Sequence, residues 1–191
     1  KVMGTHNVAN AMVSLAVASV CGIPMEAAAK QLAEFTGFQN RQQIYHTGGM
    51  TIIDDTYNAS PVSMKAGLEV LNSIEGSRAR VAVLADMKEL GPDSPRFHYE
   101  IGTNIAENPV DKLAVLGELA REIARGVREQ APGIRVYEFM DRESLIEWLK
   151  TELREGDTVL FKGSNSMKLG ETALYFRNKG KEQAESAQAR G

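Results

Sequence analysis

After residue 40, short apolar segments alternate regularly with longer amphipathic ones, and this alternation constrains the fold more than any other feature. The pattern predicts strands and helices in turn. The strands are expected at 50–54, 80–85, 112–117, 135–139 and 158–162, and the helices at 61–74, 95–107, 118–130, 142–153 and 166–177. The segment 80–85 is mostly apolar on both faces, which suits a central parallel strand covered by helices on both sides. The sequence therefore predicts an α/β fold with a doubly wound, mostly parallel sheet.

Two amphipathic segments precede this region, at residues 7–21 and 24–35. Gly22 follows the first segment where a helix commonly ends, and Pro24 opens the second. We expect a helical hairpin that packs on something outside this chain, because two helices alone make a poor core. A β-hairpin is expected next, since two strand-like segments flank the turn pair Gly48-Gly49.

The polar segment around Gln39 and Arg41 predicts a domain boundary near residue 40. We therefore expect a helical part at 1–40, a sheet domain at 41–178 and a tail at 179–191. The tail has no aliphatic side chain larger than alanine from Arg177 onward, so it is expected to be a frayed helix or disordered. The sequence begins with Lys1 rather than methionine, and we expect it to be a piece of a longer protein.

The charge and composition exclude some classes of function. A net charge of −3 gives no basic footprint for nucleic acid. No apolar run approaches the roughly 18 residues needed to cross a bilayer. The single cysteine, Cys21, cannot form an internal disulfide and is expected to be a buried small hydrophobic residue, which fits a reducing cytoplasm.

The turn Asp54-Asp55-Thr56-Tyr57-Asn58-Ala59-Ser60-Pro61 joins a strand to a helix. Ser60 as N-cap and Pro61 at the first helical position would make an ordinary helix start. Ligands of open α/β sheets bind at the carboxyl ends of strands, where this turn lies. Its carboxylates, phenol and carboxamide suit a sugar hydroxyl or a phosphate-linked group, and both interpretations can hold together.

Polar residues near the first helix and in the linker suit a nucleotide. Asn7 is a plausible N-cap, and Asn10 lies three residues further, so the two amides can share one face of the first turn. Paired amides offer the donor and acceptor that an adenine edge needs, although capping alone would also explain them. Arg41 could donate in pairs to phosphate oxygens or could be a solvated linker residue.

Two further turns follow strands. Asp86 and Glu89 could coordinate a cation, but with a lysine between them a salt-bridged turn is the commoner arrangement. Lys162-Gly163-Ser164 suits a carboxylate or phosphate, or simply ends a strand with a serine cap. His98 is expected to be structural, and no set of residues has convincing metal-ligand spacing.

In this order and at this spacing, the strings Gly4–Ala11, Asp54–Pro61, Asp86–Gly91 and 162–164, together with Arg41, resemble the last part of a Mur ligase. The resemblance covers about residues 4 to 175. The Asp-Thr-Tyr-Asn and Asp-Met-Lys-Glu-Leu-Gly strings resemble the turns of those family members that add D-alanyl-D-alanine to UDP-N-acetylmuramoyl-tripeptide. The resemblance implies a Rossmann-like C-terminal domain preceded by the end of a central ATP-binding domain.

The resemblance also implies an ATP-dependent amide ligase of the bacterial cytoplasm, acting through an acyl phosphate, with small-molecule substrates and a monomeric state. The implied ATP contacts are His6, Asn7, Asn10, Arg41, Asp55, Tyr57 and Asn58. The implied substrate contacts are Asp86, Glu89, Lys162, Ser164 and Asn165, with Arg41 and Lys162 in catalytic roles. No phosphate loop occurs in the chain, so ATP phosphates and Mg²⁺ are expected to be held mainly by an upstream part, and the chain alone is expected to be inactive.

The chain departs from the family pattern at three positions. Ala85 stands where the family has glycine, and Asn165 and Gly170 stand where an arginine and a glutamate usually occur. Two alternatives stay open. One is a related ligase of the folylpolyglutamate or cyanophycin type, and the other is a doubly wound domain that only binds a small anion.

Overall fold

A six-stranded sheet forms the centre of the computed structural model, which describes residues 4–188. The strand order is β1-β2-β6-β3-β4-β5. The strands are β1 (Gln43–Thr47), β2 (Met50–Asp55), β3 (Arg80–Ala85), β4 (Lys112–Leu116), β5 (Arg135–Phe139) and β6 (Thr158–Lys162). Only the β1–β2 pair is antiparallel. The predicted mostly parallel sheet is confirmed, with 80–85 as an interior strand.

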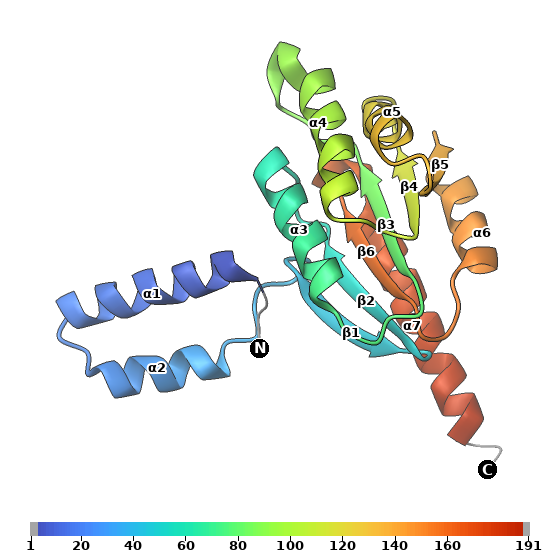
Figure 1. Cartoon of the computed structure of the whole chain (residues 1–191). Coiled ribbons are helices and arrows are strands. Elements are labelled where there is room, and N and C mark those ends of the chain that lie inside the picture. The colour runs from blue at the N-terminus through green and yellow to red at the C-terminus, as the bar shows by residue number, and fades with distance from the viewer. Residues whose placement is uncertain (1–3, 189–191) are drawn as a thin grey trace.

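Helices cover both faces of this sheet (Figure 1). On one face lie α3 (Pro61–Ser73), α4 (Ser94–Glu107) and α5 (Ala120–Gln130). On the other lie α6 (Arg142–Glu152) and α7 (Leu169–Gln188). Short 3₁₀ turns, η1 (Gly91–Asp93) and η2 (Asn165–Met167), precede α4 and α7. The domain is therefore doubly wound, as predicted.

The core consists of two apolar layers because successive strand side chains point to opposite faces. Leu84 and Leu160 pack beneath α3–α5, whereas Val83 and Phe161 pack beneath α6 and α7. All four are 0% exposed. Full burial of such a side chain contributes about 1.5–3 kcal/mol, so these layers fix the positions of the strand ends that carry the polar turns.

The two N-terminal helices form the predicted hairpin, which projects away from the sheet (Figure 1). They are α1 (Thr5–Val20) and α2 (Met25–Glu34), and Gly22 turns between them with φ of 75°. Apolar side chains on α1 are exposed, namely Val8, Met12, Val13, Val17 and Val20. Cys21 is exposed too. The expectation that it is buried is wrong, because the sheet domain does not cover the hairpin.

The last helix runs further than the sequence pattern predicted. The end expected at residue 177 is wrong, because α7 continues through Gln188. Its middle is held against the β1–β2 turn, where the Thr47 hydroxyl donates to the Arg177 carbonyl at 3.1 Å. A Cβ at Gly180 would lie 2.4 Å from Thr47 Oγ1, so glycine permits this close approach. Of the expected tail, residues 189–191 lie outside the described residues, and no helix within 4–188 is long and apolar enough to span a membrane.

Candidate functional site: a pocket between the hairpin and the sheet

A cavity of about 690 Å³ lies where the α1–α2 hairpin meets the carboxyl ends of β2 and β6. This volume falls within the range of about 300–1,000 Å³ that is usual for small-molecule sites. Six of the ATP contacts that the resemblance implies line it, and so does Lys162; the six are Asn7, Asn10, Arg41, Asp55, Tyr57 and Asn58. Side chains from four separate motifs therefore meet at one place.

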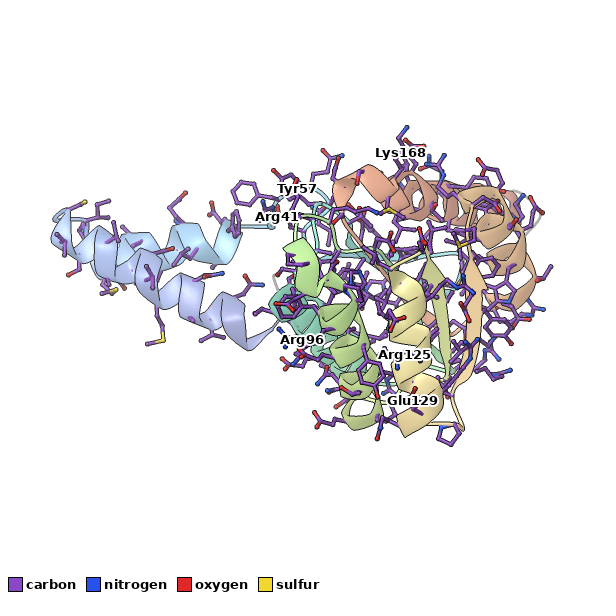
Figure 2. All side chains as sticks on the ribbon, turned by 90° about the horizontal axis from the view of Figure 1, so that it is seen from above. Arg41, Tyr57, Arg96, Arg125, Glu129 and Lys168 are labelled. Atoms are coloured by element: carbon purple, nitrogen blue, oxygen red, sulfur yellow. The ribbon has the colours of Figure 1, made fainter. Side chains whose placement is uncertain are left out.

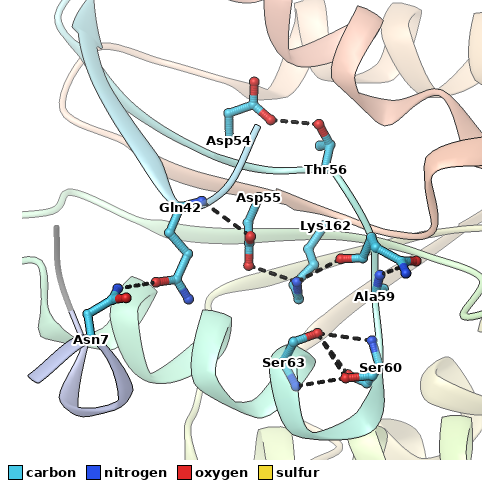
Figure 3. Close-up of polar contacts among 10 residues, drawn as sticks. Asn7, Gln42, Asp54, Asp55, Thr56, Ala59, Ser60, Ser63 and Lys162 are labelled. Atoms are coloured by element: carbon cyan, nitrogen blue, oxygen red, sulfur yellow. Dashed lines mark hydrogen bonds and ion pairs between the residues drawn. The ribbon is translucent and has the colours of Figure 1, made fainter. Parts of the chain in front are cut away.

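A buried ion pair forms the floor of this pocket (Figure 3). Asp55 and Lys162 are register partners at the ends of the parallel strands β2 and β6. Lys162 Nζ lies 2.7 Å from Asp55 Oδ2 and donates to the Asn58 carbonyl at 3.1 Å, although the lysine is only 1% exposed. Burial lowers the pKa of Lys162 below its usual value, and the neighbouring Asp55 carboxylate opposes that shift.

The linker between the hairpin and β1 is held against the end of β2. The Gln42 N–H donates to Asp55 Oδ1 at 3.2 Å, and the Tyr57 N–H donates to the Asn40 carbonyl at 2.9 Å. Between these two contacts, the Arg41 guanidinium stacks over the Tyr57 ring with 4.0 Å to the ring centroid. Figure 2 shows Arg41 and Tyr57 side by side where the hairpin joins the sheet domain.

The two asparagines of α1 share one helix face, as predicted. Asn10 Nδ2 donates to Asn7 Oδ1 at 3.4 Å, and Asn7 Nδ2 donates to Gln42 Oε1 at 3.4 Å. The prediction of Asn7 as N-cap is wrong, because the helix begins at Thr5 with Gly4 in the cap position. Asn7 therefore lies inside the first turn, where its amide faces the linker. The side chain of His6 lies outside the described part of the chain.

The start of α3 borders the same pocket. Ser60 is the N-cap, as the Ser-Pro pair indicated, and it also forms a reciprocal capping box with Ser63. Asn58 Oδ1 accepts a hydrogen bond from the Ala59 N–H at 2.8 Å. These contacts satisfy backbone donors that a helix start would otherwise leave unpaired, and they fix the loop that carries Tyr57.

Asp86, Lys88 and Ser164 form a second polar cluster, at the ends of β3 and β6. Asp86 Oδ1 accepts from the Ala120 N–H at 2.7 Å, and Oδ2 accepts from Lys88 Nζ at 2.8 Å. The Ser164 hydroxyl accepts from the Lys88 N–H at 2.8 Å. This is the salt-bridged turn that the sequence offered as an alternative, and Asp86 also anchors the first residue of α5. Glu89 is exposed and has a φ of 65°, and direct substrate contacts by this cluster stay a prediction.

His98 lies under this turn as a structural residue. Its Nε2 accepts from the Met87 N–H at 2.8 Å, and its Nδ1 lies 2.7 Å from the Ser94 carbonyl. Since Nε2 accepts and the carbonyl can only accept from Nδ1–H, the ring must be neutral. Burial lowers the pKa of His98 below its usual value, in agreement with this arrangement.

Asn165 borders a different cavity, of about 380 Å³, together with Asp54 and Thr56 on the α7 side of the sheet. Gly170 lies there as well, and a Cβ at this position would come 2.8 Å from Thr56 Oγ1. The close packing of α7 on the β2 turn thus leaves little room for a side chain at Gly170, where the resemblance led us to expect glutamate. The residues assigned to substrate therefore divide among three places rather than forming one site.

The pocket beside α1 can accept a nucleotide on chemical grounds. Paired amides lie on one wall, an arginine stacked on a tyrosine lies on another, and the helix α3 begins at its edge. Sequence reasoning missed Gln42, which joins Asn7 to Asp55. No turn signal marked it, because glutamine is an uncommon choice for its φ of 49°.

The sequence is similar to a known family and to several of its members. Residues 40–165 match the family described as Mur ligase, glutamate ligase domain. A UDP-N-acetylmuramoyl-tripeptide--D-alanyl-D-alanine ligase of Bacillus subtilis is 38% identical over 171 residues, which cover 89% of this chain. The chain spans 37% of the length of that relative.

Solved structures give the same result. A MurF structure from Acinetobacter baumannii superposes with a TM-score of 0.78 at 32% identity, covering 90% of this chain and 37% of that one. The structure of a MurF ligase from Thermotoga maritima in complex with ADP superposes with a TM-score of 0.75 at 27% identity, covering 96% of this chain and 40% of that one. Because the family match covers more than half of the sequence and the fold agrees, the chain belongs to the Mur ligase family.

Proposed function

We propose that this chain is the C-terminal part of an ATP-dependent ligase that adds D-alanyl-D-alanine to UDP-N-acetylmuramoyl-tripeptide in the bacterial cytoplasm. The observation that carries the proposal is the meeting of six expected nucleotide contacts in one pocket. The 38% identity to a ligase of that name, and the ADP complex of a relative, support it. They favour this reaction over the folylpolyglutamate, cyanophycin and binding-only alternatives.

In the proposed reaction, the terminal carboxylate of the tripeptide is activated as an acyl phosphate, and the dipeptide amine displaces phosphate to form the amide. Such chemistry depends on positioning and on neutralising charge. Asn7 and Asn10 would hold the adenine edge, Asp55 the ribose, and Arg41 the phosphate oxygens. Asp86, Glu89, Ser164 and Asn165 would contact the dipeptide or the acceptor from the carboxyl ends of the strands.

The α1–α2 hairpin would belong to a central ATP-binding domain that lies upstream and holds ATP phosphates and Mg²⁺. Its exposed apolar face, with Val13 and Val17 more than half exposed, supports this assignment. A contiguous exposed apolar face of this kind usually marks a surface that packs on another part of the protein. The chain alone would then be inactive, and the sheet domain would act as a lid that closes on the nucleotide about the linker near residue 40.

The test uses the full-length protein. Phosphate release is measured with ATP, Mg²⁺ and UDP-N-acetylmuramoyl-tripeptide, with and without D-alanyl-D-alanine. Dipeptide-dependent release is the expected result. Absence of release with every tripeptide variant would instead favour a domain that only binds a ligand.

Arg41→Ala tests the nucleotide pocket in the same assay. A charge-assisted hydrogen bond contributes about 1.5–3 kcal/mol, so the KM for ATP should rise by about 10- to 100-fold. Arg96→Ala is the matched control, because Arg96 also stacks on an aromatic ring, at 4.6 Å from the centroid of Phe97, but lies on α4 outside the pocket. Equal effects of the two substitutions would contradict the assignment of Arg41.

A further inference from the structure

The linker has an unusual backbone that needs to be held in place. Asn40 and Gln42 both have positive φ values, 60° and 49°, although neither is glycine. Asparagine adopts this conformation fairly often, but for glutamine it is costly and persists only where the surroundings impose it. Two contacts that help to hold the linker in this conformation are the Tyr57 N–H on the Asn40 carbonyl and the Gln42 N–H on Asp55.

Asp55 can hold the linker only if its own position is fixed, and Lys162 fixes it. The ammonium group lies 2.7 Å from Asp55 Oδ2, which leaves Oδ1 directed at the Gln42 N–H (Figure 3). Glycine at position 67 of α3 leaves room for the lysine side chain, since a Cβ there would lie 3.1 Å from Lys162 Cδ. A buried carboxylate that lost its cation would be left as an uncompensated charge, and it would have to take up a proton or move toward water.

We propose that Lys162, Asp55 and Gln42 form a linker clamp that sets the angle between the α1–α2 hairpin and the sheet domain. Lys162 orients the Asp55 carboxylate, and the carboxylate holds the Gln42 amide. Lys162 is then a positioning residue rather than a catalytic one. Its effect on nucleotide binding rests on the proposed function, but the clamp itself does not.

The clamp determines where Arg41 lies. Arg41 stands between the two fixed residues of the linker, and its guanidinium rests on Tyr57. Gln42 also links the clamp to the hairpin, because its side-chain oxygen accepts a hydrogen bond from Asn7 of α1 at 3.4 Å. Loss of the clamp therefore shifts Arg41 and Asn7 relative to the sheet domain.

Amide hydrogen exchange on this chain tests the clamp without any enzymatic activity. In Lys162→Met, exchange at the Gln42 and Tyr57 amides should accelerate by about tenfold or more, since a hydrogen bond of typical strength is lost. Val83, in the buried strand β3, reports global opening and is used to normalise the rates. If Lys162→Met does not fold, Lys162→Gln, which keeps a hydrogen-bond donor, is measured in its place.

Lys112→Met is the matched control. Lys112 is also a buried lysine at a strand end, 5% exposed, and its Nζ lies 2.7 Å from Glu152 Oε2, but it is far from the linker. Its loss should destabilise the domain without selectively exposing Gln42. Unchanged exchange at Gln42 in the Lys162 variant, or the same change in both variants, would overturn the proposal.

Kinetics of the full-length protein distinguish positioning from catalysis. Lys162→Gln should raise the KM for ATP by about tenfold and change kcat by less than about threefold. Loss of a group that transfers a proton typically lowers kcat by about 10²- to 10⁴-fold, and that result with an unchanged KM would overturn the positioning role. If the protein released no phosphate at all, the proposed function would fail while the exchange measurement would still decide on the clamp.

Discussion

Acid should destabilise this domain through His98, because the buried ring can only be neutral. Its Nε2 accepts from the Met87 N–H and its Nδ1 donates to the Ser94 carbonyl, so a second ring proton would face the Met87 N–H. Burial, the largest cause, lowers the pKa of His98 below its usual value, and the ring is 0% exposed. The folded state therefore resists a proton that the unfolded state accepts near pH 6.5.

The sign and size of the effect follow from proton linkage. Above about pH 6.5 neither state binds this proton, so the contribution of His98 to stability is fully present. As the pH falls below that value, the unfolded state binds one proton more than the folded state. The free energy of unfolding should then fall by up to about 1.4 kcal/mol per pH unit, until the lowered pKa of the folded state is reached.

Urea unfolding of the wild-type chain and of His98→Gln between pH 5 and pH 8 measures this effect. The glutamine carbonyl can still accept from the Met87 N–H, but the Ser94 carbonyl loses the hydrogen bond from the ring Nδ1–H, so we expect the variant to be about 1–2 kcal/mol less stable at pH 7.5. The difference should narrow below pH 6.5, because glutamine does not titrate. His46 is exposed and present in both proteins, so it does not affect the difference in stability between them. Parallel pH profiles would refute the neutral, buried histidine.

Two further predictions concern packing and capping, and both are measured by urea unfolding. Gly102→Ala should destabilise the domain by about 1–3 kcal/mol despite the better helix propensity of alanine, since its Cβ would lie 2.3 Å from the Ile123 carbonyl oxygen of α5. Gly133→Ala is the control, because a Cβ there meets nothing within 4 Å, and it should change the free energy of unfolding little. Ser60→Ala removes the N-cap of α3 and should cost about 1 kcal/mol, and equal stability would contradict the capping box.

Regular elements could be predicted from the sequence because their apolar patterns are local. The strand at 80–85 and the strand at 135–139 agree with β3 and β5 to the residue. The start of α3 was predictable for the same reason, since Ser60 and Pro61 are neighbours in sequence. The extension of α7 was not predictable from apolar periodicity, because close packing at Gly180 against a distant turn helps to hold it.

The site was predictable as a set of residues but not as an arrangement. Asn7, Asn10 and Arg41 carried no decisive local signal, and only resemblance to a family singled them out. The pairing of Asp55 with Lys162 depends on β6 lying next to β2, a strand order that is not encoded near either residue. The same limit applies to the hydrogen bond from the Ala120 N–H to Asp86, and contact of Asp86 with substrate stays a prediction.

The adjacent carboxylates of Asp54 and Asp55 have different partners because they lie on opposite faces of β2. Because neighbouring side chains on β2 point to opposite faces, Asp55 reaches Lys162 while Asp54 accepts from the Thr56 hydroxyl at 2.6 Å on the other side (Figure 3). Burial raises the pKa of Asp54. The two groups cannot act together on one ligand as an acid–base pair. The turn instead holds the loop with Tyr57 against the linker.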